Sequence, residues 1–145
     1  MLMGIKAVPA SADVDTVLSC LDNSDLLYVH IPDPIYCGRN CTPEEKAECI
    51  EAVDREFIRP LIDSLEGSDY DEYTIAVVSS VSTSCVTGEN TAEPVPYMIY
   101  RSTAHVNNGI SCFSEQNAFE SGKYVPYECD IIDIIINAEK RSAPV

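Results

Sequence analysis

Asp25-Leu26-Leu27-Tyr28-Val29-His30-Ile31 is a short, almost continuously apolar stretch that is followed by Pro32 and Pro34. An apolar run of this kind is typical of a strand in a parallel sheet that is buried on both faces. Further strands are expected at Gly4–Val8, Tyr73–Ser79 and Pro96–Tyr100. Amphipathic stretches alternate with these runs. The sequence therefore predicts an α/β fold with a mainly parallel sheet and helices on both of its faces.

The clearest helix signal is Thr42-Pro43-Glu44-Glu45, which combines an N-cap, a proline at the first helical position and a glutamate three residues after the cap. This pattern is a capping box. Apolar residues follow at helical spacing from Ala47 to Leu65, and Gly67 is the expected end of the helix. Pro60 lies inside this segment, where it is expected to kink the helix or split it in two.

Shorter helices are expected at three other places. Asp13 or Asp15 can cap a helix over 16–21, Ser114 can cap one over 115–120, and a last helix is expected from Asp130 to Lys140. The segments 32–40 and 79–90 are interpreted as loops. If the strands before them are parallel, these loops face the same side of the sheet, where α/β proteins keep their sites.

The chain has 145 residues, 9 Lys and Arg, and 24 Asp and Glu, which gives a formal charge of −15. This length fits a single domain over 1–145. The negative charge disfavours nucleic acid and anionic membrane surfaces as partners. No run of apolar residues is long enough for a membrane span. Seven cysteines without a C-x-x-C pair, and an N-terminus unlike a secretory signal, predict reduced thiols in the cytoplasm.

Common motifs for nucleophiles, cofactors and metal ions are absent from the sequence, and its two histidines, His30 and His105, have no partner at metal-ligand spacing. Cys37, Cys41 and Cys49 allow two interpretations. Their spacing can be read as a zinc site. The alternative, which we favour, is that Cys49 fills a core position of its helix as a small apolar side chain.

Five segments occur in an order that resembles a known family: Lys6–Thr16, Asp25–His30, Lys46–Pro60, Glu93–Tyr97 and Phe113–Glu115. They are similar to the C-terminal part of archaeal-type cofactor-independent phosphoglycerate mutases, in the alkaline phosphatase superfamily of metalloenzymes. The resemblance covers essentially the whole chain. It implies that the chain corresponds to the C-terminal portion of an alkaline-phosphatase-like domain.

The resemblance also implies where two divalent ions, Mn²⁺ or Zn²⁺, are bound in the family. Position by position, the family's ligands fall here on Ile35, Arg39, Ser80, Val81 and Asn90. Ile and Val cannot ligate a metal ion, and Arg brings a positive charge. The family's phosphoryl-carrying nucleophile has no counterpart in the chain. We therefore expect no catalytic residue, no metal ion and no other cofactor.

These observations predict a catalytically degenerate mutase relative that serves as a binding or regulatory module. Two alternatives remain open: one part of a metal-dependent mutase or phosphatase that another segment or subunit completes, and a stable remnant without a role. Arg39 could meet a small anionic ligand directly. A homo-oligomer or another protein partner is expected, because a partial sheet leaves an edge or face exposed. The residues expected to line a residual pocket are His30, Asp33, Arg39, Ser80, Thr83 and Asn90.

Overall fold

The computed structural model describes residues 13–104, 109, 112–127 and 129–136. The chain divides into two compact units, which we describe separately: residues 1–69 with 83–91, and residues 70–82 with 92–145. The strand expected at Gly4–Val8 and the end of the last expected helix, 137–140, lie outside the described residues. No helix in the described ranges is both long enough and apolar enough to cross a membrane.

The first unit begins with α1 (Val14–Leu21), which is capped as expected by Asp13. The Thr16 N–H donates to Asp13 Oδ1 at 2.9 Å, and the Thr16 hydroxyl donates to the same oxygen at 2.7 Å. These bonds, with that of the hydroxyl foremost, lower the pKa of Asp13. The buried apolar side chains of this unit are Val17 on this helix and Leu61 and Leu65 further along the chain.

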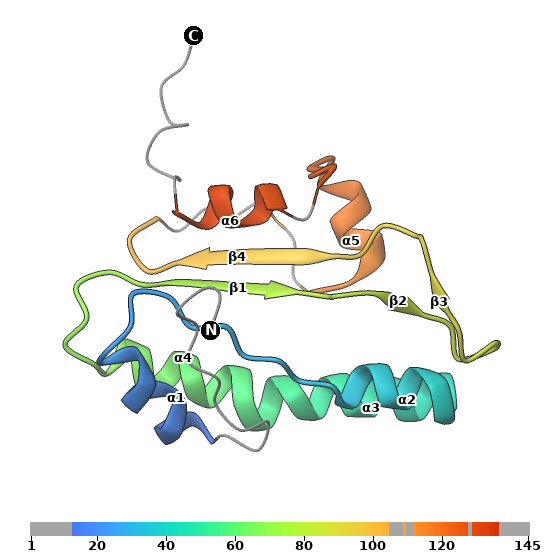
Figure 1. The fold of residues 1–145 in the computed structure, drawn as a ribbon, viewed down its shortest axis with the longest axis horizontal. Helices are drawn as coiled ribbons and strands as arrows, with labels where there is room; N and C mark the ends of the chain where they lie inside the picture. Colours follow the sequence, from blue (N-terminus) through green and yellow to red (C-terminus); the bar gives the residue numbers. More distant parts are fainter. Residues whose placement is uncertain (1–12, 105–108, 110–111, 128, 137–145) are drawn as a thin grey trace, which may run out of the picture. The chain divides into compact units, whose positions relative to one another are not determined.

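Three consecutive helical segments form one long helix in the first unit: α3 (Pro43–Val53), η1 (Asp54–Ile58) and α4 (Arg59–Glu66) (Figure 1). The helix ends at Gly67, as expected. Pro60 neither ends nor splits it. Instead, the π-helical segment η1 lies just before the proline, and the Arg59 N–H donates to the Asp54 carbonyl, five residues back. A wider turn relieves the clash between a proline ring and the carbonyl four residues earlier.

Two further elements of the first unit lie in the segments that were expected to be loops. Helix α2 (Asp33–Asn40) contacts α3. Strands β2 (Ser82–Thr83) and β3 (Asn90–Thr91) form a small antiparallel hairpin, of which only Ser82 belongs to the second unit. Gly88 adopts a φ of 69° in the hairpin turn, and its N–H donates to the Ser84 carbonyl at 2.8 Å. A side chain at this position would strain the turn.

The second unit is built on the antiparallel pair β1 (Thr74–Val78) and β4 (Tyr97–Arg101), in which Ala76 is opposite Ile99. The rings of Tyr73 and Tyr100 pack across the two strands with centroids 6.1 Å apart. Helix α5 (Glu115–Glu120) has its expected cap at Ser114. Helix α6 (Cys129–Ile136) lies beside β4 (Figure 1), where Arg101 Nη2 donates to the Ile134 carbonyl at 2.8 Å.

The predicted α/β fold with a mainly parallel sheet is wrong. The described residues are mostly helical, and their strands form two small antiparallel pairs. Parallel neighbours need a long crossover, usually a helix, but the segment between β1 and β4 contains only the β2–β3 hairpin. Residues 25–31 form no strand. Leu26 is 55% exposed and Tyr28 is 77% exposed, so their apolar character does not reflect burial within the described chain.

Candidate functional site

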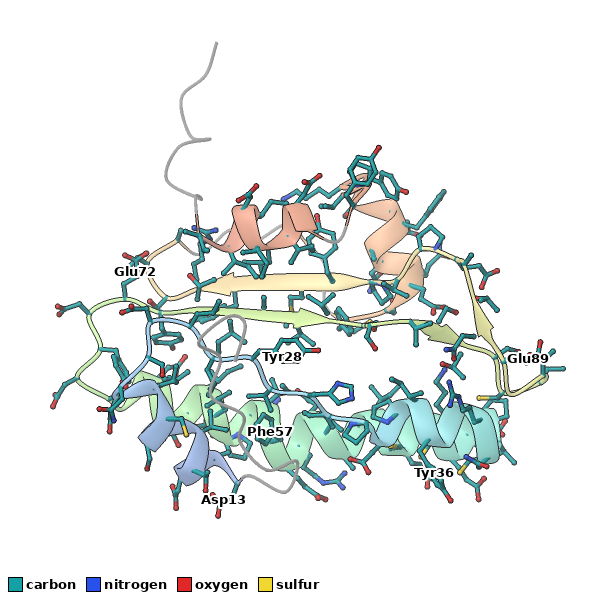
Figure 2. All side chains as sticks on the ribbon, in the orientation of Figure 1. Asp13, Tyr28, Tyr36, Phe57, Glu72 and Glu89 are labelled. Atoms are coloured by element: carbon teal, nitrogen blue, oxygen red, sulfur yellow. The ribbon has the colours of Figure 1, made fainter. Side chains whose placement is uncertain are left out.

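A group of hydrogen-bonded side chains joins α2, α3 and the β2–β3 hairpin within the first unit. Arg39 Nη2, near the end of α2, donates to Asn90 Oδ1 at 3.3 Å. The Thr83 hydroxyl donates to the same oxygen at 3.1 Å. We call Gly38, Arg39, Lys46, Thr83 and Asn90 the Arg39 cluster. In Figure 2, Tyr36 marks α2 three residues before Arg39, and Glu89 marks the hairpin one residue before Asn90.

Thr83 holds the centre of the Arg39 cluster. Only 4% of its surface is exposed. Lys46 Nζ, on α3, donates to the Thr83 backbone carbonyl at 2.7 Å. On the opposite helix Gly38 is buried, and a Cβ atom built on it would lie 3.0 Å from Thr83 Cβ. Glycine at this position therefore lets α2 approach the hairpin closely enough for Arg39 to reach Asn90.

The capping box of α3 fixes the backbone between Arg39 and Lys46. The Glu45 N–H donates to the Thr42 hydroxyl at 3.2 Å, and the Thr42 N–H donates to Glu45 Oε2 at 2.8 Å. The bond from the Thr42 backbone is the main reason why the pKa of Glu45 is lowered. Lys46 follows directly after Glu45, so the capping box also fixes the position of Lys46 on the first turns of α3.

The Arg39 cluster places two positive side chains close to one buried threonine in a strongly acidic chain. Lys46 is half-buried and uses its ammonium group on a backbone carbonyl. Arg39 is exposed, and its bond to Asn90 uses one of the five N–H groups of a guanidinium. In the described part of the chain, the guanidinium of Arg39 makes no other hydrogen bond and no ion pair. Chemically, the exposed guanidinium offers donors to an anion, whereas Asn90 Oδ1 and the Thr83 carbonyl already accept hydrogen bonds from Arg39, Thr83 and Lys46.

Three thiols lie next to this cluster on α2 and α3. Cys37, Cys41 and Cys49 are free and half-buried. The hydrogen bond with Cys49, followed by burial, raises the pKa of Cys37. Burial, followed by the hydrogen bond with Cys37, raises the pKa of Cys41. Among the described residues, no group of three His, Cys, Asp or Glu side chains is arranged to hold a metal ion, and these thiols are included in that finding.

The structure brings together three of the residues expected to line a pocket: Arg39, Thr83 and Asn90. His30 is exposed in the irregular segment before α2, and Asp33 is exposed at the start of that helix. Ser80 is exposed in the second unit, so it is not placed relative to the cluster.

The other positions that the resemblance linked to metal ions are Ile35, which is half-buried on α2, and Val81, which is half-buried in the second unit. Sequence reasoning missed the role of Gly38 and Lys46 in the cluster. Lys46 begins one of the segments that carry the resemblance, whereas Gly38 lies between two of them. The available signals were a single lysine among the acidic residues of the first helical turns, and a glycine between Pro34 and Pro43.

The described residues form an α+β arrangement of helices and small antiparallel strand pairs, with the Arg39 cluster between α2, α3 and the β2–β3 hairpin. Comparison with known proteins identifies the relatives of the chain. No family model and no solved structure matches it. It is 26% identical over 125 residues to the 2,3-bisphosphoglycerate-independent phosphoglycerate mutase of Methanosarcina mazei, covering 86% of the chain and 31% of that relative. It is 33% identical over 98 residues to the enzyme of the same name from Aeropyrum pernix, and the match covers 68% of the chain and 22% of that relative.

A third relative, the 2,3-bisphosphoglycerate-independent phosphoglycerate mutase of Methanosarcina acetivorans, is 27% identical over 119 residues, which are 82% of the chain and 30% of that protein. The chain is therefore a partial homologue of the archaeal-type 2,3-bisphosphoglycerate-independent phosphoglycerate mutases. It spans about 30% of the length of the first of these relatives. The resemblance drawn from its motifs is confirmed.

Proposed function

We propose that the chain is a catalytically degenerate, phosphoglycerate mutase-like module that binds a small anionic ligand at the Arg39 cluster. The ligand class is a phosphate or carboxylate group on a small molecule. One observation carries the proposal: positions 39 and 90, which the resemblance links to metal ligands, are 51 residues apart and meet in one hydrogen bond. The residues at these two positions are now an arginine and an asparagine.

The chemistry of this pair supports an anion in place of a cation. A guanidinium repels a divalent ion and presents a planar set of donors that matches carboxylate and phosphate oxygens. The bond to Asn90 orients the guanidinium from one side. Thr83 fixes Asn90 in turn, since both donors share the same amide oxygen. Binding at such a site is an ion-pairing event, so it should weaken as salt is added.

The test is isothermal titration of the chain with inorganic phosphate and with 3-phosphoglycerate at low and high salt. We expect saturable binding of at least one of the two, weakened about tenfold or more by Arg39→Ala. Arg59→Ala, which removes another exposed arginine from the same unit, is the matched control and should bind like the wild type. Equal affinity of the two variants would overturn the assignment of the site, and absence of binding would overturn the proposed ligand class.

A second candidate function is one part of a metal-dependent mutase or phosphatase that another segment or subunit completes. This candidate is favoured by the partial coverage of the relatives, because the chain spans about 30% of the length of the two Methanosarcina enzymes. It is also favoured by exposed apolar side chains in each unit, among them Tyr28 at 77% in the first and Phe119 at 84% in the second. Contiguous exposed apolar patches are typical of surfaces that another polypeptide covers, and these side chains are candidates for such a patch.

The same exposed side chains support the proposal that the chain forms a homo-oligomer or binds another protein. Sedimentation at micromolar concentration should then show a species heavier than 15.9 kDa, and a clean monomer would count against self-association.

We also propose a cytoplasmic location, supported by the free state of the cysteines in the described residues. If the chain showed mutase activity with Mn²⁺ in a complex with a partner, this result would favour the second candidate function, one part of a metal-dependent enzyme, over the binding module.

A further inference from the structure

The contact between α2 and α3 gathers three cysteines of the first unit at one place. Cys37 and Cys41 are one helical turn apart, and the Cys41 N–H donates to the Cys37 carbonyl at 2.9 Å. Cys49 is on α3, which contacts α2. All three are free and half-buried, so their sulfur atoms are shielded without being closed off from small molecules.

Cys37 stands in the middle of this thiol cluster. Its sulfur lies within hydrogen-bonding range of Cys49 on one side and of Cys41 on the other. Cys85, in the loop of the β2–β3 hairpin, acts on Cys41 through its charge and not through a hydrogen bond. The cluster does not meet the arrangement needed for a metal ion in the described residues. Two adjacent thiols without a metal have one other common chemistry, which is disulfide formation.

We propose that Cys37 and Cys49 are a dithiol site that forms a reversible disulfide bond on reaction with a low-molecular-weight disulfide such as oxidised glutathione. The bond would tie α2 to α3. It would span the segment that contains Arg39, Thr42 and Lys46.

Geometry selects Cys49 over Cys41 as the partner of Cys37. A disulfide needs Cβ atoms about 3.5–4.5 Å apart. Side chains four residues apart on one helix have Cβ atoms about 5–6 Å apart, which is too far without distorting the helix. Two helices in contact have no such fixed spacing, and α2 and α3 bring Cys37 and Cys49 close enough to interact directly.

The reaction proceeds by two thiol–disulfide exchanges. One protein thiolate attacks the small disulfide, forms a mixed disulfide and releases one small thiol. The second protein thiolate then attacks the mixed disulfide, forms the Cys37–Cys49 bond and releases a second small thiol. Two protons leave the two cysteines, and the two electrons that they give up reduce the small disulfide. Because the hydrogen bond with Cys49 and burial raise the pKa of Cys37, the reaction should accelerate as the pH rises above neutrality.

The site can be tested by oxidising the Cys20→Ser variant with oxidised glutathione and digesting it with trypsin without reduction. Cys20 is replaced because it shares the tryptic peptide 7–39 with Cys37. Trypsin cleaves after Arg39, Lys46 and Arg55, so Cys37, Cys41 and Cys49 fall on the separate peptides 7–39, 40–46 and 47–55. We expect 7–39 linked to 47–55, two hydrogens lighter than the sum of the two peptides and separable by dithiothreitol.

Variants decide between the thiols. In the Cys20→Ser background, Cys41→Ser should keep the linked pair, and Cys49→Ser should replace it by a glutathione adduct on Cys37. The oxidised chain should also unfold several degrees higher than the reduced chain, because a closed loop restricts the unfolded state. A link between 40–46 and either neighbour would overturn the choice of Cys49. A chain modified only at the exposed Cys112 would overturn the site itself.

Discussion

Gly38 gives the sharpest test of how the Arg39 cluster is built. A Cβ atom at this position would lie 3.0 Å from Thr83 Cβ, 3.1 Å from Thr83 Cγ2 and 3.2 Å from the Thr83 carbonyl oxygen. Thr83 Cβ and its carbonyl cannot rotate away, because both are fixed to the backbone. In Gly38→Ala, α2 and the β2–β3 hairpin must therefore separate by a few tenths of an ångström. The Arg39–Asn90 bond, already 3.3 Å long, would be the first to be lost.

Two opposing terms set the expected loss of stability. Placing one extra carbon in a well-packed contact costs about 2 kcal/mol. Alanine is favoured over glycine inside a helix by about 1 kcal/mol. The difference predicts that Gly38→Ala lowers the free energy of unfolding by about 1 kcal/mol. Glycine is thus required at position 38 because α2 approaches Thr83 closely, and not because the backbone needs the conformational freedom of glycine.

Gly67→Ala is the matched control, to be compared with Gly38→Ala by urea unfolding followed by circular dichroism. At Gly67 the nearest atoms to an added Cβ are Asp63 O at 3.5 Å and Ser64 O at 3.8 Å, which are ordinary contacts. With φ of −87° and ψ of 0°, alanine fits this position and should add about 0.5 kcal/mol through a restricted unfolded chain. A Gly38→Ala variant as stable as Gly67→Ala would refute the close contact with Thr83.

Three further outcomes follow from particular bonds. Thr42→Ala should lower the free energy of unfolding by about 1 kcal/mol in urea, with Thr42→Ser close to wild type, because the hydroxyl caps α3. Folding lowers the pKa of Glu45, so its ionised carboxylate contributes fully to the free energy of unfolding above the ordinary pKa near 4.5. This contribution is lost as the pH falls through the lower pKa of the folded state. Glu45→Gln should therefore make the free energy of unfolding less dependent on pH in that range. Arg101→Met should cost about 1.5 kcal/mol and speed hydrogen exchange in α6, because it removes the bond to the Ile134 carbonyl, and unchanged exchange there would contradict this.

Helix ends were predictable from the sequence because capping is a local interaction. Thr42 and Glu45 satisfy each other's backbone donors within one turn, as the four-residue pattern indicates. Asp13 and Ser114 cap their helices in the same way. The strands that contain Ala76 and Ile99 were also predicted from their apolar character, and the structure has strands at both places.

Strand pairing was not predictable in the same way, because it depends on contacts between distant residues. The apolar run 25–31 satisfies every local requirement of a buried strand, yet it has no strand partner in the described residues. The pair Pro32 and Pro34 indicated a loop, although prolines are also accepted in the first turn of a helix, where α2 has Pro34. At position 60 the expected split does not occur, because a π-helical segment before the proline keeps the helix continuous.

The candidate site was predictable only where the resemblance placed it. Arg39, Thr83 and Asn90 are scattered in sequence, and nothing in their spacing shows that they meet. Lys46 and Gly38 were missed because their partner is Thr83, whose backbone carbonyl and methyl group carry no motif.

Thermal unfolding with millimolar Mn²⁺ and with 3-phosphoglycerate, each against an EDTA control, is the most direct test of the central claim that the Arg39 cluster binds an anion and not a metal ion. Mn²⁺ is the ion of choice, because Zn²⁺ would also bind thiols such as Cys37 and Cys49. A ligand at a hundred times its dissociation constant stabilises the folded chain by about 2.7 kcal/mol, a rise of several degrees. The account predicts a rise with 3-phosphoglycerate that Arg39→Ala abolishes, and none with Mn²⁺. A saturable rise with Mn²⁺ that EDTA reverses would contradict it and would favour the metal-dependent enzyme.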